Sequence, residues 1–286
     1  MVVVKGNAKI NLTLDILGKR PDGYHEVAMV MQAIELHDTL ELTKTAGEIK
    51  LAIDVPGLEA DASNLAWRAA ALIIKEGNIK GGVSIKLTKR IPIAAGLAGG
   101  SADAAAVLKG MNELYELNLD ADKLCELGAK LGSDIPFCLS GGTMLAEGRG
   151  EVLKRLPDFP ETWVVLAKPP IAVSTAWAYK NYDAQGADKH PDNNKIQQEI
   201  AQHNRKGAAD LLCNVLESVT IKKYDVISHY KKMMLEQGAI ASMMSGSGPT
   251  VFGLTDDQQT AEKIAEYLRT ATDAAVFVTR TIKQAQ

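Results

Sequence analysis

The sequence predicts an α+β protein of two domains. Strand and helix patterns alternate irregularly along the chain instead of as strict β-α-β units, which favours α+β over a doubly wound parallel sheet. The length of 286 residues suffices for two ordinary domains. The periodic pattern thins after Gly150, and the following stretch RLPDFPET carries two prolines. We therefore expect a domain boundary near residue 155, which separates residues 1–155 from residues 156–286.

In the N-terminal half, strict alternation of apolar and polar residues indicates strands, and apolar stripes indicate helices. Two of these helices have candidate caps. Ser63 or Asn64 can cap the helix over 64–75, and Asp120 can cap the helix over 120–131, which Gly132 would end. The helix between these two, over about 101–115, follows the glycine-rich stretch described below. The expected strands are 9–16, 49–55 and 83–87, and the expected helices are 64–75, about 101–115 and 120–131.

The C-terminal half shows the same two patterns around a turn-rich loop, DAQGADKHPDNN. The expected strands are 163–168, 239–243, 250–254 and 275–279. The expected helices are about 174–182, a helix around Ile196, 221–237 and 261–270.

Composition excludes several classes of protein. Hydrophobic residues make up 46% of the chain and charged residues 23%, as in soluble globular proteins. The net charge of -3 offers no electrostatic case for nucleic-acid or membrane binding. Cys125, Cys138 and Cys213 form no C-x-x-C pair, and the five histidines form no H-x-x-x-H pair, which argues against a disulfide framework and a transition-metal site. Without a signal peptide or an apolar span, we expect a cytoplasmic protein.

The stretch IPIAAGLAGGSADAAA, which begins at Ile91, combines three glycines with the start of a helix. It matches neither the Walker A pattern nor the G-x-G-x-x-G pattern. Gly96, Gly99 and Gly100 still allow positive φ and a close approach to a ligand, and the helix N-terminus that follows favours an anion. The alternative is an ordinary turn with Ser101 as the helix cap.

Two further segments carry candidate chemistry. In GNAKINLTLDI, Lys9 and Asn11 project from the same face of a strand, which is either a ligand-facing surface or a plain solvent-facing one. In LGSDIPF, Asp134 precedes Ile135 and Pro136 and is either a catalytic carboxylate or a cap or turn residue. A second glycine cluster, SGSGPTVF from Ser245, is either a hairpin turn or another backbone approach to a ligand.

Together and in this order, these segments resemble the three motifs of the GHMP kinases. The motifs correspond here to residues 8–11, 92–102 and 245–249. PDGYHEV, LGSDIPF and GGTMLAEGRGE are further similar to the members that act on cytidine-diphosphate methylerythritol in the non-mevalonate isoprenoid pathway. The resemblance implies an N-terminal half like ribosomal protein S5 domain 2 and a ferredoxin-like C-terminal half.

The resemblance also implies transfer of the γ-phosphoryl group of ATP, with Mg²⁺, to the 2-hydroxyl of the methylerythritol unit. Asp134 would accept the hydroxyl proton and Lys9 would stabilise phosphoryl charge. Tyr24 and Tyr179 would stack on cytosine and His25 would bind its polar edge. Asn11 and Thr175 would reach the erythritol or phosphate end. The residues expected to contact ATP are Pro92, Ile93, Ala94, Ala95, Gly96, Leu97, Ala98, Gly99, Gly100, Ser101 and Ala102, with Asn64 and Lys89 at the adenosine.

Three positions depart from the family pattern. Ala98 replaces a usual glycine-loop residue, a small change if its φ is negative. Ala102 stands where many relatives carry a second serine, so a hydroxyl contact to phosphate or Mg²⁺ must come from Ser101 or from water. Asn7 stands where proline is frequent.

Other readings remain open. The chain could be a GHMP kinase for homoserine, mevalonate or a monophosphate, or a non-catalytic nucleotide or sugar sensor on the same fold. The Tyr24-His25 pair argues against the first, and the presence of both Lys9 and Asp134 argues against the second. RNA binding lacks a basic stripe with interleaved aromatic residues. Whether the protein is a monomer or a homodimer is left open.

Overall fold

The structure is a computed structural model that describes residues 1–284. The chain forms two compact units that are interleaved along the sequence. Unit 1 comprises residues 1–8, 36–93 and 98–141, and unit 2 comprises residues 9–35, 94–97 and the described residues from 142 onward. Two strands, β1 (Val2–Asn11) and β3 (His25–Thr45), run through both units. The expected boundary near residue 155 divides the chain at a single point, whereas each of these units consists of several segments. That boundary stays a prediction.

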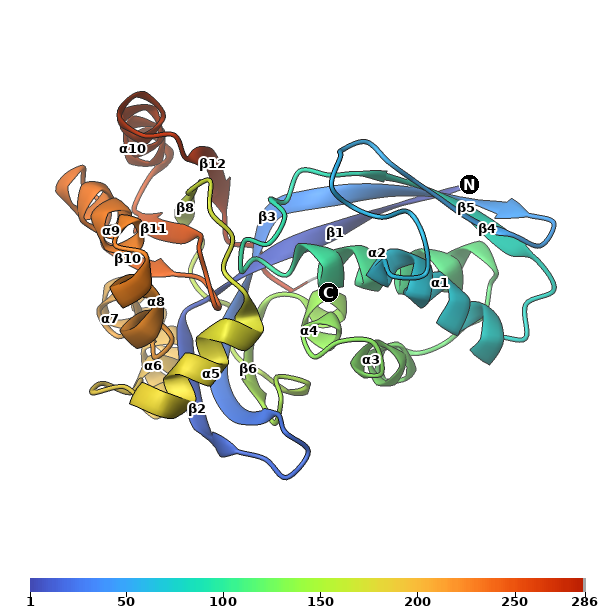
Figure 1. The fold of residues 1–286 in the computed structure, drawn as a ribbon, viewed down its shortest axis with the longest axis horizontal. Coiled ribbons are helices and arrows are strands. Elements are labelled where there is room, and N and C mark those ends of the chain that lie inside the picture. Colours follow the sequence, from blue (N-terminus) through green and yellow to red (C-terminus); the bar gives the residue numbers. More distant parts are fainter. Residues whose placement is uncertain (285–286) are drawn as a thin grey trace. The chain divides into compact units, whose positions relative to one another are not determined.

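Unit 1 packs helices against strands. β4 (Ile49–Ile53) pairs in parallel with β5 (Gly82–Thr88), and β5 pairs antiparallel with the second half of β3. The helices α1 (Leu65–Glu76) and α2 (Gly99–Leu114) contact each other and lie side by side (Figure 1). The shorter helices α3 (Ala121–Ala129) and α4 (Ile135–Ser140) complete the unit.

Small side chains explain how α1 and α2 pack so closely. Ala66, Ala69 and Ala70 of α1 and Ala104 and Ala105 of α2 are all buried. They share one apolar core with strand residues Leu40, Leu42, Ile85 and Leu87. This core holds the first turn of α2, which carries part of the glycine-rich stretch.

Unit 2 contains two sets of paired strands. β2 (Thr13–Lys19) pairs with the first half of β3 and, in parallel, with β9 (Cys213–Asn214). β6 (Thr143–Glu147) pairs with β3 and with β7 (Val152–Arg155). A separate antiparallel sheet has the order β10-β11-β8-β12. Its strands are β8 (Trp163–Lys168), β10 (Ala241–Met244), β11 (Val251–Thr255) and β12 (Ala275–Arg280).

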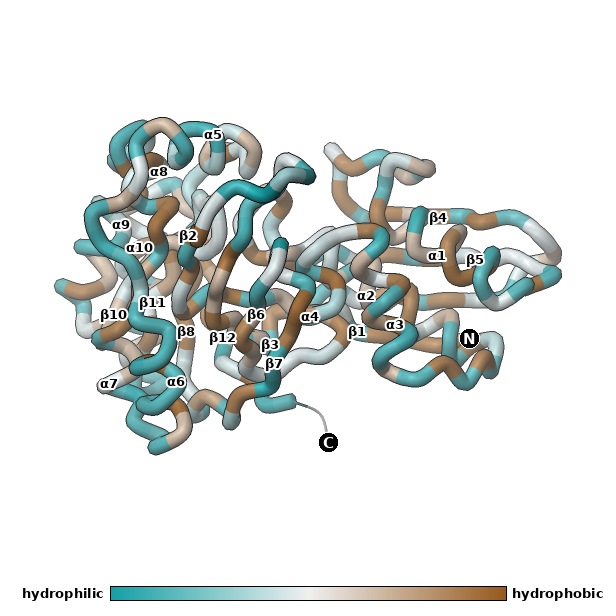
Figure 2. Tube along the Cα trace, turned by 90° about the horizontal axis from the view of Figure 1, so that it is seen from below, coloured by the Kyte–Doolittle hydropathy of each residue, from teal (hydrophilic) through white to brown (hydrophobic). Residues whose placement is uncertain are grey.

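Two helices of unit 2 contact the antiparallel sheet. α9 (Val226–Glu236) contacts β10 and β11, and α10 (Gln258–Ala271) contacts β8, β11 and β12. The remaining helices are α5 (Thr175–Gln185), α6 (Asn193–Ala201), α7 (Arg205–Asp210) and α8 (Glu217–Lys223). Figure 2 shows hydrophobic segments along β3, whereas α6 is largely hydrophilic.

The α+β class is confirmed, and most of the expected elements are present. The single helix expected over 221–237 is wrong, because the chain leaves helical geometry at Tyr224 (φ -129°, ψ 82°) and forms α8 and α9. The strand expected over 9–16 is interrupted at Leu12, between β1 and β2. Among the helices of residues 1–284, none combines the length and the apolar character that crossing a membrane requires.

Candidate active site

Three of the sequence motifs meet within unit 2. The backbone N–H of Lys9 donates to the carbonyl of Leu97 at 3.2 Å, and the Ser245 hydroxyl donates to the carbonyl of Gly96 at 3.0 Å. A Cβ on Gly96 would lie only 2.2 Å from the Ser245 carbonyl oxygen. A Cβ on Gly246 would lie 3.1 Å from the Gly96 oxygen and 3.5 Å from the Lys9 ammonium. The two glycine segments therefore contact each other through bare backbone, beside a lysine ammonium.

Lys9 and Asn11 lie on the same face of β1, as the alternation predicts. This face is buried instead of solvent-facing, since Lys9 is 4% exposed and Asn11 is 0% exposed. The Lys9 ammonium donates to Asn11 Oδ1 at 2.7 Å, and Asn11 Nδ2 contacts Met29 Sδ at 3.2 Å. The Asn11 amide thus orients the ammonium.

Asn214 fixes the second glycine segment and was missed by sequence reasoning. Its side chain is buried, and Nδ2 donates to the carbonyls of Met244 and Gly246 at 2.9 and 2.8 Å. Its Oδ1 accepts the backbone N–H of Leu216 at 3.0 Å. These bonds use both donors and one acceptor site of the buried amide, and they hold the turn at Gly246 in place. No local pattern reveals this role, because the turn lies 30 or more residues further along the chain.

The glycine-rich loop takes left-handed backbone conformations at three positions. Ala94, Gly96 and Ala98 have φ values of 51°, 74° and 60°. The condition placed on Ala98, a negative φ, is not met, and an alanine there costs about 1–2 kcal/mol relative to an unstrained residue. α2 begins at Gly99 with Ala98 at the N-cap position and no side-chain cap. The alternative in which Ser101 caps the helix is therefore wrong, because Ser101 lies inside the first turn.

The first turn of α2 rests on a buried ion cluster in unit 1. The Lys89 ammonium donates to Asp38 Oδ2 at 2.5 Å and to Asp103 Oδ2 at 2.7 Å. Asp38 Oδ1 also accepts the backbone N–H of Ile91 at 2.8 Å. Burial opposes the charge on Lys89, but the two carboxylates outweigh it and raise the pKa of Lys89. A Cβ on Gly99 would lie 3.5 Å from this ammonium, so the cluster lies against the start of α2.

Asp103 is the member of this cluster whose charge is opposed by its surroundings. Burial raises the pKa of its carboxyl to about 7, against the lowering effect of Lys89, while the nearby Asp38 raises it further. Within residues 1–284 its Oδ1 has no hydrogen-bond partner.

The two residues expected at the adenosine have structural contacts. Besides the ion cluster of Lys89, Asn64 caps α1, since its Oδ1 accepts the N–H of Ala66 at 2.9 Å. Its Nδ2 donates to the carbonyl of Glu59 at 2.9 Å. These contacts give both side chains a role in folding, and an adenosine contact stays a prediction for each.

Asp134 lies in unit 1, at the N-terminal end of α4. Its side chain is half-buried and makes no capping hydrogen bond to the helix. The interpretation of this residue as a cap is therefore not supported. Its backbone (φ -81°, ψ -10°) continues into Ile135 and Pro136 at the first helical positions.

Unit 2 brings together the side chains expected to bind a base, a set that we call the base cluster: Tyr24, His25 and Tyr179. The rings of His25 and Tyr179 have centroids 4.8 Å apart and are tilted by 42°. His25 Nε2 lies 2.6 Å from Asp183 Oδ1. Tyr24 is 55% exposed, and the Arg149 guanidinium lies 5.1 Å from its ring centroid. The cluster thus offers an exposed aromatic ring next to a hydrogen-bonded imidazole that is tilted against a second ring.

Thr175 connects α5, the helix that carries Tyr179, to the second glycine segment. It is the first residue of α5, and its hydroxyl lies 2.9 Å from that of Ser247. Ser174 caps the helix by accepting the N–H of Trp177 at 3.3 Å. The start of α5 is therefore tied to the turn that approaches Lys9.

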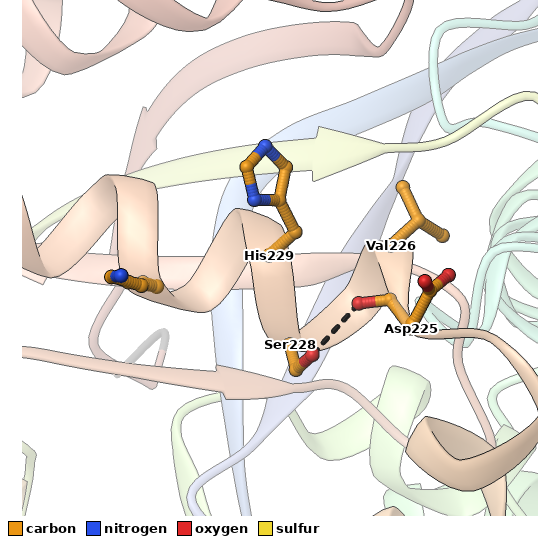
Figure 3. Close-up of a pocket in the computed structure, with 5 residues that line it drawn as sticks. Asp225, Val226, Ser228 and His229 are labelled. Atoms are coloured by element: carbon orange, nitrogen blue, oxygen red, sulfur yellow. Dashed lines mark hydrogen bonds between the residues drawn. The ribbon is translucent and has the colours of Figure 1, made fainter.

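A surface hollow lies elsewhere in unit 2, at the start of α9 (Figure 3). Its lining includes Asp225, whose carbonyl accepts the Ser228 hydroxyl at 2.8 Å, together with Val226, His229 and Lys232. None of the site residues expected from the sequence lines it. In the part of the chain that the structure describes, no group of three His, Cys, Asp or Glu side chains is placed to hold a metal ion.

Comparison with known proteins places this geometry in a family. The model of the GHMP kinases N terminal domain matches residues 64–142, and that of the GHMP kinases C terminal domain matches residues 195–274. The 4-diphosphocytidyl-2-C-methyl-D-erythritol kinase of Acetivibrio thermocellus is 49% identical over 98% of this chain and 99% of its own length. The chain belongs to the GHMP kinase family. The kinase of the same name from Bacillus pumilus is 51% identical over 94% of this chain and 93% of its own length.

Solved structures of GHMP kinases share the fold. A crystal structure of 4-(cytidine 5'-diphospho)-2C-methyl-D-erythritol kinase matches with a TM-score of 0.84, 31% identity and complete coverage of both chains. Homoserine kinase from Cytophaga hutchinsonii matches with a TM-score of 0.74 and 19% identity, over 99% of this chain and 96% of its own. At 19% identity, the similarity to homoserine kinase concerns the fold alone. The expected two-part GHMP kinase fold is confirmed.

Proposed function

We propose that this GHMP kinase transfers the γ-phosphoryl group of ATP to the 2-hydroxyl of 4-diphosphocytidyl-2-C-methyl-D-erythritol. Full-length relatives with about half of their residues identical bear the name of that activity. The observation that carries the choice among GHMP kinases is the base cluster. An acceptor such as homoserine or mevalonate has no nucleobase and would leave these aromatic groups without a use. Because the reaction consumes ATP, we place the enzyme in the cytoplasm.

The glycine-rich loop is the proposed phosphate cradle. Bare backbone at Gly96 and Gly246 permits close approach, and the N–H groups of Gly99, Gly100 and Ser101 have no intrahelical acceptor. Residues 92–102 as a whole would line the nucleotide. These N–H groups would face the phosphates and not a cation. The Ser101 hydroxyl is the protein oxygen that would hold Mg²⁺ together with the nucleotide, and when bound the ion would neutralise phosphate charge.

Phosphoryl transfer asks the protein mainly for positioning and for charge stabilisation. We assign charge stabilisation to the Lys9 ammonium, which the Asn11 amide orients. We assign the acceptance of the hydroxyl proton to the Asp134 carboxylate, whose side chain is not used as a helix cap. Asn11 and Thr175 would contact the erythritol or phosphate end of the acceptor.

The acceptor's base is assigned to the base cluster. Tyr24 and Tyr179 would stack on the cytosine ring, with His25 at its polar edge. Tyr24 already contacts Arg149 and remains 55% exposed, so it can still contact a ligand.

The test measures ATP-dependent phosphorylation of three acceptors by the purified protein: CDP-methylerythritol, homoserine and mevalonate. We expect turnover with the first alone. Turnover with a simple alcohol alone would reassign the substrate, and ATP binding without turnover of any acceptor would favour the sensor.

A matched pair of variants tests the proton acceptor. Asp134→Asn is expected to bind ATP normally but to lose about 10²–10⁴-fold in kcat. Asp122→Asn removes the same charge from an exposed position of the same unit and is expected to keep its activity. Equal activity of the two variants would remove Asp134 from the mechanism.

A further inference from the structure

An acidic residue with no role in the proposed reaction, Asp183, contacts the base cluster through His25. Asp183 lies four residues after Tyr179 on α5, so the two side chains share one face of the helix. His25 Nε2 lies 2.6 Å from Asp183 Oδ1, and Lys19 Nζ donates to Asp183 Oδ2 at 3.1 Å. The His25 side chain is 11% exposed, against 32% for Asp183. One carboxylate therefore anchors the imidazole through Nε2 and also binds the Lys19 ammonium.

This contact determines which ring nitrogen carries the proton. An ionised carboxylate can only accept hydrogen bonds, and the His25 imidazole and the Lys19 ammonium together lower the pKa of Asp183. The nitrogen that faces Asp183, Nε2, must then carry a hydrogen. In a neutral imidazole the other nitrogen, Nδ1, is left as an acceptor. No hydrogen bond to Nδ1 occurs among the described residues. Nδ1 is also not one of their buried polar atoms without a partner, so it is left accessible to a ligand.

An acceptor at this point discriminates between pyrimidines. Cytosine presents an exocyclic amino group as a donor, whereas uracil presents a carbonyl oxygen at the same ring position. We propose that Asp183 is a positioning residue that holds His25 in its Nε2–H tautomer and thereby selects cytosine over uracil. This inference rests on the proposed function, because it takes the base cluster to be the cytidine site. A hydrogen bond of this kind discriminates by about 1–3 kcal/mol, or roughly 5- to 150-fold.

The specificity test compares kcat/KM for CDP-methylerythritol with that for the corresponding UDP ester. We expect the wild-type protein to prefer the cytidine ester by at least about 5-fold. Asp183→Asn can accept from Nε2 or donate to it, so the tautomer is no longer dictated and the preference should fall below about 3-fold. Lys19→Gln removes the other partner of the carboxylate but keeps the His25 contact, and it should keep the wild-type preference. A wild-type protein without preference, or a folded Asp183→Asn variant with the full preference, overturns the proposal.

A second measurement does not depend on the reaction or on the stability of the variant. The ¹⁵N chemical shifts of the His25 imidazole in the wild-type protein report its tautomer directly. We expect the Nε2–H form, and an Nδ1–H form overturns the proposal even if the kinase activity is as proposed. If the protein phosphorylates neither ester but does phosphorylate homoserine or mevalonate, the proposed function and the base selection fall together while the tautomer assignment stands.

Discussion

Gly96 is the position where the glycine-rich loop allows least change. Its φ of 74° is left-handed, and a Cβ there would lie 2.2 Å from the Ser245 carbonyl oxygen. For Gly96→Ala the backbone conformation costs about 1–2 kcal/mol, of which the stiffer unfolded chain returns about 0.4–1 kcal/mol. The overlap is with backbone, so no rotamer relieves it, and overpacking of this kind costs about 1–3 kcal/mol. We expect Gly96→Ala to lose about 1–5 kcal/mol of unfolding free energy.

Gly100→Ala is the matched control for stability. A Cβ on Gly100 would meet only Leu65 Cδ1, at 3.5 Å, an ordinary contact, and the residue lies within α2. Alanine in a helix is favoured over glycine by about 0.5–1 kcal/mol, so this variant should gain stability. Urea denaturation compares the two, and the KM for ATP of Gly96→Ala should rise because the loop must move. If Gly96→Ala proves as stable as Gly100→Ala, the close contact between the two glycine segments is refuted.

Three further variants test other contacts. Ala98→Gly removes the left-handed cost and should raise the unfolding free energy in urea by about 0.5–1 kcal/mol; no gain would contradict the loop conformation. Asp103 has its pKa raised from 3.8 to about 7, so the folded state holds this proton more tightly and stability should decline as pH rises through that interval. Asp103→Asn should lack this part of the decline. If the unfolding free energies of the wild-type protein and the variant change in parallel from pH 4 to 8, the raised pKa of Asp103 is excluded as a cause of the decline. Asn214→Ala frees the turn at Gly246 and should raise the KM for ATP about 10-fold with a smaller effect on kcat, whereas an unchanged KM would deny Asn214 its positioning role.

Local signals predicted the capped helices well. Asn64 and Asp120 each accept a backbone N–H at the start of a helix, as the sequence predicts. Ser174, which was expected as the first residue of its helix, is instead the cap of α5. β3 was missed because its residues 27–34 are buried without alternation, and such a run shows no period of two. The break between α8 and α9 was also missed, because the apolar pattern continues through Tyr224.

In the site, too, the sequence predicts local arrangements but not contacts between distant segments. Lys9 and Asn11 share one strand, so alternation alone places them together. The partners of functional residues were missed, since Asp183 is 158 residues from His25 and the Lys89 cluster joins segments 14 and 51 residues apart. Such pairings depend on tertiary packing, which no local pattern encodes.

The absence of a second serine in the glycine-rich loop has a physical explanation. Ala102 is fully buried, and its backbone carbonyl lies 2.6 Å from the position that a Cβ on Gly6 would occupy. β1 and α2 therefore approach each other closely at this point, and a hydroxyl on residue 102 would need a partner inside the core. Ser101, by contrast, is half-buried in the first turn of α2. If the loop binds phosphate as proposed, the side-chain hydroxyl that reaches it must be that of Ser101, since only this hydroxyl is both in the first turn and accessible.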